Sequence, residues 1–388
     1  MQFTQASAPQ QTSPFAVRNG AGTRPARDLE DRAIGWWLLG CAVFVLAMVA
    51  VGGLTRLTGS GLSMTDWKPV TGFLPPMTEA DWILLYDQYR ATPEYRTVNA
   101  GFGLEGFKGI FWLEFIHRVL GRLIGLVFFV PLLVFTLQRR IPWRRLPIYL
   151  VVFALGGLQG LLGWYMVQSG LVDDPSVSPF RLTAHLGLAV VILMALLVMA
   201  HRRLSPVYPW KASLSPQQLA AARESLTPIR RLGLPATGLV FLTILAGGLV
   251  AGYDAGLMYN TFPTMQGQWI PDGVMALSPW WLNIYDNIIT VQFNHRLLGL
   301  TTLGICLWLI WSAERNFFLL QSRLQSAPSL SFFRVLTRLL AFSVLLQIIL
   351  GIFTLLLSVP IGLASAHQIN AILVLSAALW LYMDSRAV

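Results

Sequence analysis

The sequence reads Phe115-Ile116-His117-Arg118-Val119-Leu120-Gly121 at the start of one long apolar stretch and Phe293-Asn294-His295-Arg296-Leu297-Leu298-Gly299 at the start of another. A histidine followed by an arginine opens both stretches, and each stretch is long enough for a helix that crosses a lipid bilayer. The same polar pair at the same place in two apolar stretches indicates an internal repeat. The rest of the chain can be divided around these two segments.

Eight such apolar stretches occur in the 388 residues, of which 55% are hydrophobic and 12% are charged. Because about 20 apolar residues span the hydrocarbon core of a bilayer, each stretch predicts one membrane-spanning helix. The predicted spans are residues 34–54, 111–137, 146–167, 182–200, 232–251, 293–311, 339–357 and 364–383. A mean hydropathy of +0.60 agrees with this composition. The sequence therefore predicts an all-α integral membrane protein with eight transmembrane helices.

Further landmarks recur in the same order in the two halves of the chain. They are Gly52-Gly53 and Gly247-Gly248, Gln159 and Gln347, and Ala184-His185 and Ala366-His367. Four spans in each copy keep both copies in the same orientation across the membrane. We therefore expect two four-helix bundles related by a pseudo-twofold axis along the membrane normal.

The repeat predicts how the chain is divided. Residues 32–204 form an N-terminal four-helix half and residues 232–388 a C-terminal four-helix half, with residues 205–231 as a cytoplasmic linker. Residues 1–31 are largely polar and contain no acidic residue before Asp28, which is typical of a disordered tail. A mitochondrial presequence is the alternative interpretation of this tail.

The distribution of charge predicts the orientation of the helices. Arginines gather in the N-terminal tail and in the loops between spans two and three, four and five, and six and seven, whereas residues 253–289 contain three aspartates and no Lys or Arg. By the positive-inside rule, both termini face the cytoplasm. The formal net charge of +10 is explained by this orientation and does not indicate nucleic-acid binding.

Four of the five histidines lie at matching positions of the repeat. His117 and His295 open the second span of each half, and His185 and His367 open the fourth. Titratable residues at membrane depth are costly and usually functional. Two imidazoles that face each other across a helical bundle suit a bis-histidine haem iron, whereas zinc and copper usually recruit further ligands. The alternative for a single histidine is helix packing, and His201, which has no counterpart, is predicted to be interfacial.

The two copies differ three residues before the first histidine, where Glu114 stands in one half and Gln292 in the other. A carboxylate one helical turn from a haem can move protons or stabilise a developing positive charge, and an amide can do neither. The alternative is that Glu114 only caps or hydrates the start of its helix. The difference favours a reactive first half and a second half that relays electrons.

Other polar residues near the predicted outer helix ends keep more than one interpretation. Arg118 and Arg296 directly follow their histidines and are expected to bind haem propionates, because guanidinium groups bind carboxylates well. For Arg56, Arg122 and Arg181 an ordinary interfacial role is equally open. Gln159 and Gln347 are expected to hold helices together or to contact haem, and Trp67, Trp82, Trp280 and Trp281 to anchor the membrane interface. Cys41 and Cys306 lie inside spans, so no structural disulfide is expected. The sequence has no C-x-x-C-H motif, so any haem is expected to be held without thioether bonds.

Four segments identify a resemblance to a known family. They are Gly52-Gly-Leu-Thr-Arg-Leu-Thr-Gly-Ser-Gly-Leu-Ser-Met-Thr-Asp-Trp67, Glu114-Phe-Ile-His-Arg-Val-Leu-Gly-Arg122, Tyr259-Asn-Thr-Phe-Pro263 and Gln292-Phe-Asn-His-Arg-Leu-Leu-Gly299. They resemble the haem A synthase family of bacteria and mitochondria, and the resemblance runs from about Arg32 to Asp384. Outer loops without a cysteine pair are similar to the proteobacterial and mitochondrial branch.

The resemblance implies an activity and a set of roles. The expected enzyme is an oxidoreductase that oxidises the C8 methyl of haem O to a formyl group by successive hydroxylations, with oxygen derived from water, and so supplies haem A to cytochrome oxidase. His295 and His367 match the ligands of a bound haem b cofactor. His117 and His185 match the ligands on the substrate side, and Glu114 matches the acidic residue needed for the oxidation.

The resemblance and pathway logic also imply a setting. The expected location is a bacterial inner membrane, with the mitochondrial inner membrane as the alternative, and the expected upstream partner is a haem O synthase (protohaem farnesyltransferase). The electron acceptor and the oligomeric state, including a homo-oligomer, stay open. The chief rival function is a di-haem cytochrome b that only carries electrons, and a haem transporter is a third candidate. Glu114 without a counterpart, together with a loop at 55–110 that can cover a substrate, argues against the cytochrome.

Overall fold

The structure is a computed structural model that describes residues 26–67, 71–171, 175–204, 215–323 and 330–387. Most of the predicted tail, residues 1–25, lies outside the described residues, whereas residues 26–31 already belong to the first helix. Within the described ranges the chain is helical and contains no β-strand beyond an isolated bridge between Met265 and Gln268.

Eight helices of the described chain are long and apolar enough to cross a membrane, as the sequence predicted. They are α1 (Ala26–Leu57), α4 (Leu104–Leu137), α5 (Leu146–Gln168), α6 (Pro179–Leu204), α9 (Thr227–Gly252), α11 (Ile288–Arg323), α12 (Leu330–Leu356) and α13 (Ile361–Ala387). Most extend several residues beyond the predicted apolar spans, because a helix can continue into polar sequence once its apolar part has formed. The predicted all-α membrane fold class is confirmed.

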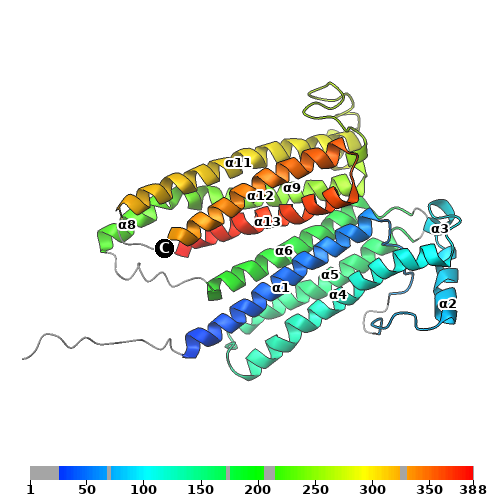
Figure 1. The fold of residues 1–388 in the computed structure, drawn as a ribbon, viewed down its shortest axis with the longest axis horizontal. Helices are drawn as coiled ribbons and strands as arrows, with labels where there is room; N and C mark the ends of the chain where they lie inside the picture. Colours follow the sequence, from blue (N-terminus) through cyan, green and yellow to red (C-terminus); the bar gives the residue numbers. More distant parts are fainter. Residues whose placement is uncertain (1–25, 68–70, 172–174, 205–214, 324–329, 388) are drawn as a thin grey trace, which may run out of the picture.

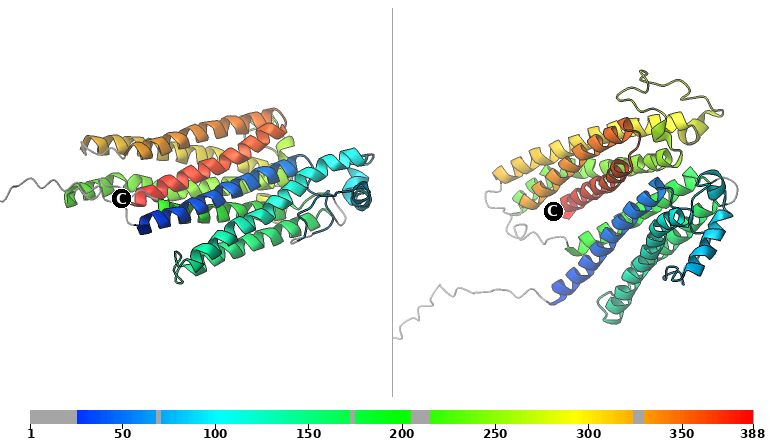
Figure 2. Two further views of the ribbon diagram at one scale, coloured as in Figure 1. Left: turned by 60° about the horizontal axis from the view of Figure 1, so that its bottom comes forward. Right: turned by 45° about the vertical axis from the view of Figure 1, so that its right-hand side comes forward.

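The long helices lie in two groups of four (Figure 1). The first group is α1, α4, α5 and α6, and the second is α9, α11, α12 and α13. Contacts between the groups are made mainly by α6 with α9 and by α1 with α13. Both views in Figure 2 show the start of α1 and the end of α13 at one end of the molecule, here called the terminal end. The opposite end, which carries the short helices α2 and α3, is called the loop end.

Short helices at the loop end cover the start of α4. They are α2 (Glu79–Arg90) and α3 (Pro93–Thr97). A capping box between Thr78 and Asp81 starts α2, and Thr92 caps α3 with Pro93 in its first turn. Tyr89 of α2 is fully buried and stacks on Phe107 of α4, with 5.2 Å between the ring centroids. The loop from 55 to 110 is therefore partly an ordered helical cover, which the sequence did not reveal.

The remaining connections also contain short helices. The segment between α9 and α11 contains two 3₁₀ turns, η1 (Ala255–Leu257) and η2 (Trp280–Leu282), and the short helix α10 (Asn283–Asp286). Helix α8 (Pro216–Ser225) lies in the predicted linker, of which residues 205–214 are outside the described ranges, and α9 begins five residues before the predicted boundary at 232.

One buried polar contact joins the two groups at the terminal end. His201 at the end of α6 lies 2.6 Å through Nε2 from Oδ1 of Asp384 at the end of α13, and both side chains are buried. The edge of the His201 ring packs against Trp380, with ring centroids 5.1 Å apart. A buried polar group needs such a partner. His201, predicted to be interfacial, is thus part of the contact between the two groups, while Cys41 and Cys306 are free and buried.

Candidate functional site

A single cavity of about 1260 Å³ runs between the two groups of helices. All four repeated histidines line it, together with Glu114 and Gln292. Ligand pockets usually measure about 300–1,000 Å³, so this cavity is larger than one ordinary site. The structure therefore brings the predicted site residues of both halves to one cavity.

Each of the four histidines stands over a glycine of a neighbouring helix. In the first half, an added Cβ atom at Gly52 would lie 3.0 Å from Cε1 of His117, and one at Gly163 would lie 2.9 Å from Cε1 of His185. In the second half, the matching distances are 3.1 Å from Gly247 to His295 and 2.8 Å from Gly351 to His367. Any residue larger than glycine at these places would push against the imidazole ring. The same glycine–histidine contact therefore sets the position of all four rings, and the glycines accommodate an imidazole at each site.

The second-half histidines have the spacing of a metal site. The ring centroids of His295 and His367 are 6.5 Å apart, and the ring planes are inclined by 82°. This gap fits one metal ion with two metal–nitrogen bonds of about 2 Å. Nδ1 of His117, His185 and His295 is buried and has no hydrogen-bond partner among the described residues. A buried nitrogen without a partner is costly for a histidine that only packs helices, so these nitrogens favour a ligand role. Two other ring nitrogens contact amides: Nε2 of His185 lies 3.3 Å from Nε2 of Gln159, and Nδ1 of His367 lies 3.1 Å from Nε2 of Gln347.

The remaining side chains limit which metal group fits. In the described ranges no group of three or more His, Cys, Asp or Glu side chains comes together as a metal site. Each histidine pair thus offers two imidazoles and no third protein ligand of these types among the described residues. A haem iron, which receives its other ligands from the macrocycle, suits this donor set better than zinc.

Two half-buried glutamines contact the second histidine of each half. Nε2 of Gln159 donates to the backbone carbonyl of His185 at 3.0 Å, and Nε2 of Gln347 donates to that of His367 at 3.1 Å. Asn370 also donates to Oε1 of Gln347 at 2.8 Å, whereas Oε1 of Gln159 is buried without a hydrogen-bond partner. The sequence left open whether these glutamines hold helices together or contact haem, and their contact with a histidine was not predicted. Gln347 is thus held by one hydrogen bond more than its counterpart Gln159.

Glu114 is almost completely buried, with 3% of its surface exposed. Its Oε2 accepts hydrogen bonds from the Ser63 hydroxyl at 2.6 Å and the Met64 amide at 2.9 Å. Its Oε1 accepts from Arg118, whose Nε lies 2.9 Å away. The carboxylate is thus fixed in direction and compensated in charge, and it does more than hydrate the helix start.

The two arginines that follow the histidines hold loops over the loop end of the cavity. Arg118 donates to the carbonyls of Met64 and Asp66, both at 2.8 Å. Arg296 donates to the carbonyls of Tyr259 at 2.7 Å and Thr261 at 2.8 Å. These loop carbonyls are equivalent in the repeat. Residue 64 corresponds to 259 and residue 66 to 261, with the same offset as between Gly52 and Gly247. Both arginines line the cavity, while much of their hydrogen-bonding capacity serves these loops.

At the matched position before His295, Gln292 makes a different contact. Its Nε2 donates to the carbonyl of Tyr259 at 3.1 Å, and its Oε1 is buried without a hydrogen-bond partner. Glu114 accepts from the amide of Met64, whereas Gln292 donates to the carbonyl of Tyr259. The two halves thus differ at this position in the charge of the side chain, as predicted from the sequence. They differ also in whether that side chain accepts a hydrogen bond from the loop or donates one to it.

The other candidate arginines have separate surroundings. Arg56 at the end of α1 donates to the carbonyl of Ala251 and to the carboxylate of Asp254, both at 3.0 Å, which links the two groups at the loop end. Arg181 lies over the ring of Tyr165, 3.7 Å from its centroid, and is not among the residues that line the cavity. Arg122 lines the cavity. Trp67, predicted to anchor the interface, also lines the cavity.

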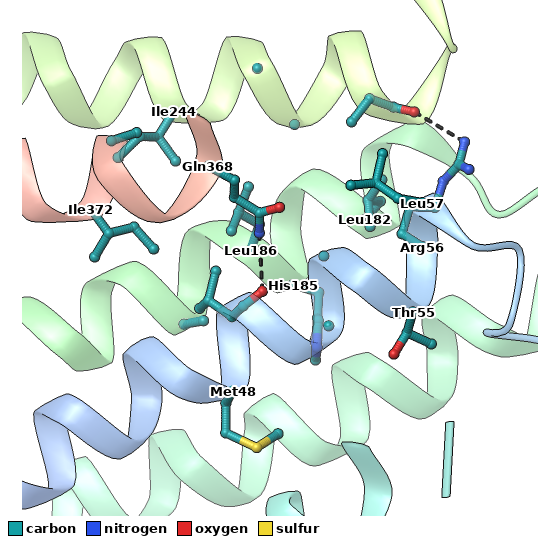
Figure 3. A pocket seen from close by; sticks show the side chains of 18 of the residues that line it. Met48, Thr55, Arg56, Leu57, Leu182, His185, Leu186, Ile244, Gln368 and Ile372 are labelled. Carbon is teal, nitrogen blue, oxygen red and sulfur yellow. Dashed lines mark hydrogen bonds between the residues drawn. The ribbon is translucent and has the colours of Figure 1, made fainter. Parts of the chain in front are cut away.

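Sequence reasoning missed Gln368, the residue after His367. Its Nε2 donates to the carbonyl of Val49 at 3.1 Å, and a Cβ atom at Gly53 would lie 2.2 Å from its Oε1. Figure 3 shows this side chain reaching from α13 across to α1, close to Leu186 of α6. The Gly52-Gly53 pair therefore contacts His117 of its own group and Gln368 of the other. The Gly-Gly pair was the only signal in the sequence for this contact. It indicates a close approach of another residue but does not identify that residue.

Comparisons with known proteins agree with this geometry. The family model described as cytochrome oxidase assembly protein (COX15-CtaA) matches residues 35–379. A protein of Nitrosomonas eutropha named "Heme A synthase" is 48% identical over 349 residues, which are 89% of this chain and 92% of the relative. Relatives of the same name from Nitrosospira multiformis and Parvibaculum lavamentivorans are each 44% identical, over 100% and 91% of this chain and 99% and 94% of their own length. The motifs predicted this relationship, and the chain belongs to the cytochrome oxidase assembly family that includes the haem A synthases.

Proposed function

We propose that this protein is a haem A synthase, a membrane-bound oxidoreductase that converts haem O to haem A. The observation that carries the proposal is one cavity with two histidine pairs, of which only the first has a buried carboxylate, Glu114, beside it. Relatives at 39–48% identity over most of the chain are named for this activity. The reaction oxidises the C8 methyl of haem O to a formyl group with oxygen from water.

We assign haem O to His117 and His185, and a resident haem b to His295 and His367. The extra hydrogen bond from Asn370 to Gln347 supports a permanently bound group in the second half, because it fixes the carbonyl contact that orients His367. Its absence at Gln159 suits a site that exchanges substrate and product. When bound, haem b supplies a one-electron redox centre.

Glu114 is assigned to proton handling at the substrate methyl. Oxidation of a methyl group by water releases protons and electrons in equal number, so a base beside the reacting carbon assists each hydroxylation. The hydrogen bonds from Ser63, Met64 and Arg118 hold the carboxylate in one direction. The loops tied down by Arg118 and Arg296 limit the entry of bulk water at the loop end.

We further propose that the halves are related by a pseudo-twofold axis, with the terminal end in the cytoplasm of a bacterium and the loop end outside the inner membrane. Two observations support the axis: the matching loop contacts of Arg118 and Arg296, and the four glycine–histidine contacts. The arginine-rich linkers at the terminal end support the orientation. A haem O synthase in the same membrane would supply the substrate.

The experiment that tests the function changes Glu114 to Gln and analyses the extracted pigments. This change removes the carboxylate with little loss of volume and makes the position resemble Gln292. General acid–base groups contribute about 10² to 10⁴ in rate, so haem A should fall by a factor in that range while haem O or a partly oxidised form accumulates. Haem b should stay at normal occupancy because all four histidines are intact.

The matched control is Gln292→Glu, which should not create a second active site because that half retains its cofactor. Normal haem A output from Glu114→Gln would remove the proton-handling role. Finding haem b alone in the wild-type protein, in cells that make haem O, would favour the di-haem electron carrier instead.

A further inference from the structure

A second buried carboxyl group, Glu94, lies at the loop end outside the cavity. It is in α3, has 6% of its surface exposed, and its Oε2 has no hydrogen-bond partner among the described residues. A buried carboxyl oxygen without a partner is costly, so its retention calls for an explanation. Sequence reasoning did not single out Glu94, because it stands in a polar loop among exposed charges.

The surroundings of Glu94 are mostly aromatic. The Tyr89 hydroxyl of α2 donates to the Glu94 carboxyl and accepts from the Asn99 amide at 2.7 Å. Tyr95 of its own helix packs against Tyr89, with ring centroids 5.7 Å apart. From α4 the charged group that acts on Glu94 is Glu114. The titratable neighbours are thus two phenols and one carboxyl group. The nearby cations accompany these neighbours: Arg118 pairs with Glu114, and Arg90 lies over the Tyr95 ring.

These neighbours favour a protonated Glu94 near neutral pH. Burial and, to a lesser extent, the negative charge of Glu114 raise the pKa of Glu94 to about 7, against a smaller opposing effect of the Tyr89 hydroxyl. Burial also raises the pKa of Tyr89, so the phenol stays protonated and Glu94 is the member of the pair that titrates. A carboxyl with a pKa near the working pH can both accept and release a proton.

The segment that binds Glu114 connects the two carboxyl groups. The Met64 amide donates to Glu114, and the Met64 side chain packs against the aromatic cluster of Tyr89, Phe107, Phe111 and Phe115. Both Glu114 oxygens accept hydrogen bonds, one of them from a guanidinium group. Glu114 thus lines the cavity and also contacts the segment that packs against this aromatic cluster, in which Tyr89 is the partner of Glu94.

We propose that Glu94 is a proton-relay residue that receives protons released at Glu114 and passes them to water at the loop end. The proposal rests on the assignment of the oxidation to the first-half site. In each transfer an O–H bond forms on Glu94 as the O–H bond of the Glu114 carboxyl breaks, either directly or through a water molecule that accepts one proton as it gives up another. Glu94 then returns to the carboxylate by giving the proton to external water, so the relay carries protons only and the electrons leave by another route.

The first test reads the carboxyl group directly. Infrared difference spectra of purified haem-loaded protein, recorded across neutral pH, should show a protonated carboxyl C=O band that disappears with a midpoint at about pH 7. The band should be absent in Glu94→Gln and present in Glu105→Gln, whose carboxylate is exposed and pairs with Lys108. A full-intensity band in Glu94→Gln would overturn the proposal.

The second test measures haem A formation in isolated membranes that contain haem O, as a function of pH. The wild-type rate should rise as pH increases through about 7, where Glu94 becomes able to accept protons. Glu94→Gln should lose this rise and, above neutral pH, should be slower by about the lower limit of 10² for acid–base groups. Glu94→Asp should restore part of the rise, and haem b content measured in each variant identifies any failure to fold.

The two tests separate this proposal from the proposed function. Wild-type rates at every pH in Glu94→Gln, with haem A formation abolished in Glu114→Gln, would reject the relay and leave the enzyme assignment in place. Wild-type rates in Glu114→Gln would reject the role of Glu114, and the relay with it.

Discussion

Four histidines in one cavity have equivalent glycine contacts but are assigned to two different haems, so single-residue changes should separate them. Replacing His295 with Ala removes one of the two nitrogens that lie across the 6.5 Å gap. We expect the low-spin haem b spectrum to be lost from the purified protein. The matched variant, His117→Ala, should keep that spectrum and lose haem A formation. Equal loss of haem b in both variants would contradict the assignment of the halves.

Glu94 also gives a pH dependence of stability at the residue scale. Its pKa is 4.5 ordinarily and about 7 in the folded protein, so between these values the folded state binds more protons than the unfolded chain. The free energy of unfolding should therefore fall as pH rises through this window. In Glu94→Gln this loss should be absent, and the variant should gain thermal stability relative to wild type above neutral pH. Melting followed by circular dichroism on both sides of the window, with Glu105→Gln as control, measures the difference.

The sequence could predict site residues only where polarity contrasts with their surroundings. His117, His185, His295, His367 and Glu114 stand out because they interrupt apolar spans, and the repeat then pairs them. Glu94 and Gln368 carry no such signal, since one lies in a polar loop and the other follows a histidine at a helix start. Their surroundings depend on helices from other parts of the chain, α2 and α4 for Glu94 and α1 for Gln368.

At the scale of the helices, glycines set how closely an imidazole approaches a neighbouring backbone. In Gly351→Ala the new Cβ would lie 2.8 Å from Cε1 of His367, closer than real Cβ contacts, so the ring must move. We expect a lower haem b content and an altered spectrum at unchanged protein yield. Gly304→Ala in α11 is the control, because nothing lies within 4 Å of its added Cβ and alanine favours a helix. Equal haem b content in the two variants would show that the close contact does not position His367.

The long helices were predictable because about 20 apolar residues have few alternatives to a membrane-spanning helix. The short helices were not predicted, although capping boxes mark their starts, at Thr78 and Asp81 for α2 and at Ser215 and Gln218 for α8. Such short segments are helical only when packed, as α2 is against α4, and their composition resembles that of a loop. Most predicted spans lie inside the observed helices for a related reason, because hydropathy marks the apolar part of a helix and not its first and last hydrogen bonds.

At the scale of the whole molecule, the orientation in the membrane is directly testable. Arginines of the loop between α4 and α5 lie at the terminal end, and Asp272 lies in the segment between α9 and α11 at the loop end. If the positive-inside rule applies, a reporter active only outside the cytoplasm should work when fused after Asp272 and fail when fused after Arg140. The reverse pattern would place the histidine cavity nearer the cytoplasmic face and overturn the proposed orientation.

The two groups of helices are tied at both ends of the molecule, by Arg56 with Asp254 at one end and His201 with Asp384 at the other, with Gln368 between them. Any hinge motion between the two groups would have to break one of these contacts. These three contacts therefore oppose a change in the distance between the two histidine pairs. A ligand of the first pair would then enter and leave without a change in the distance between that pair and the second.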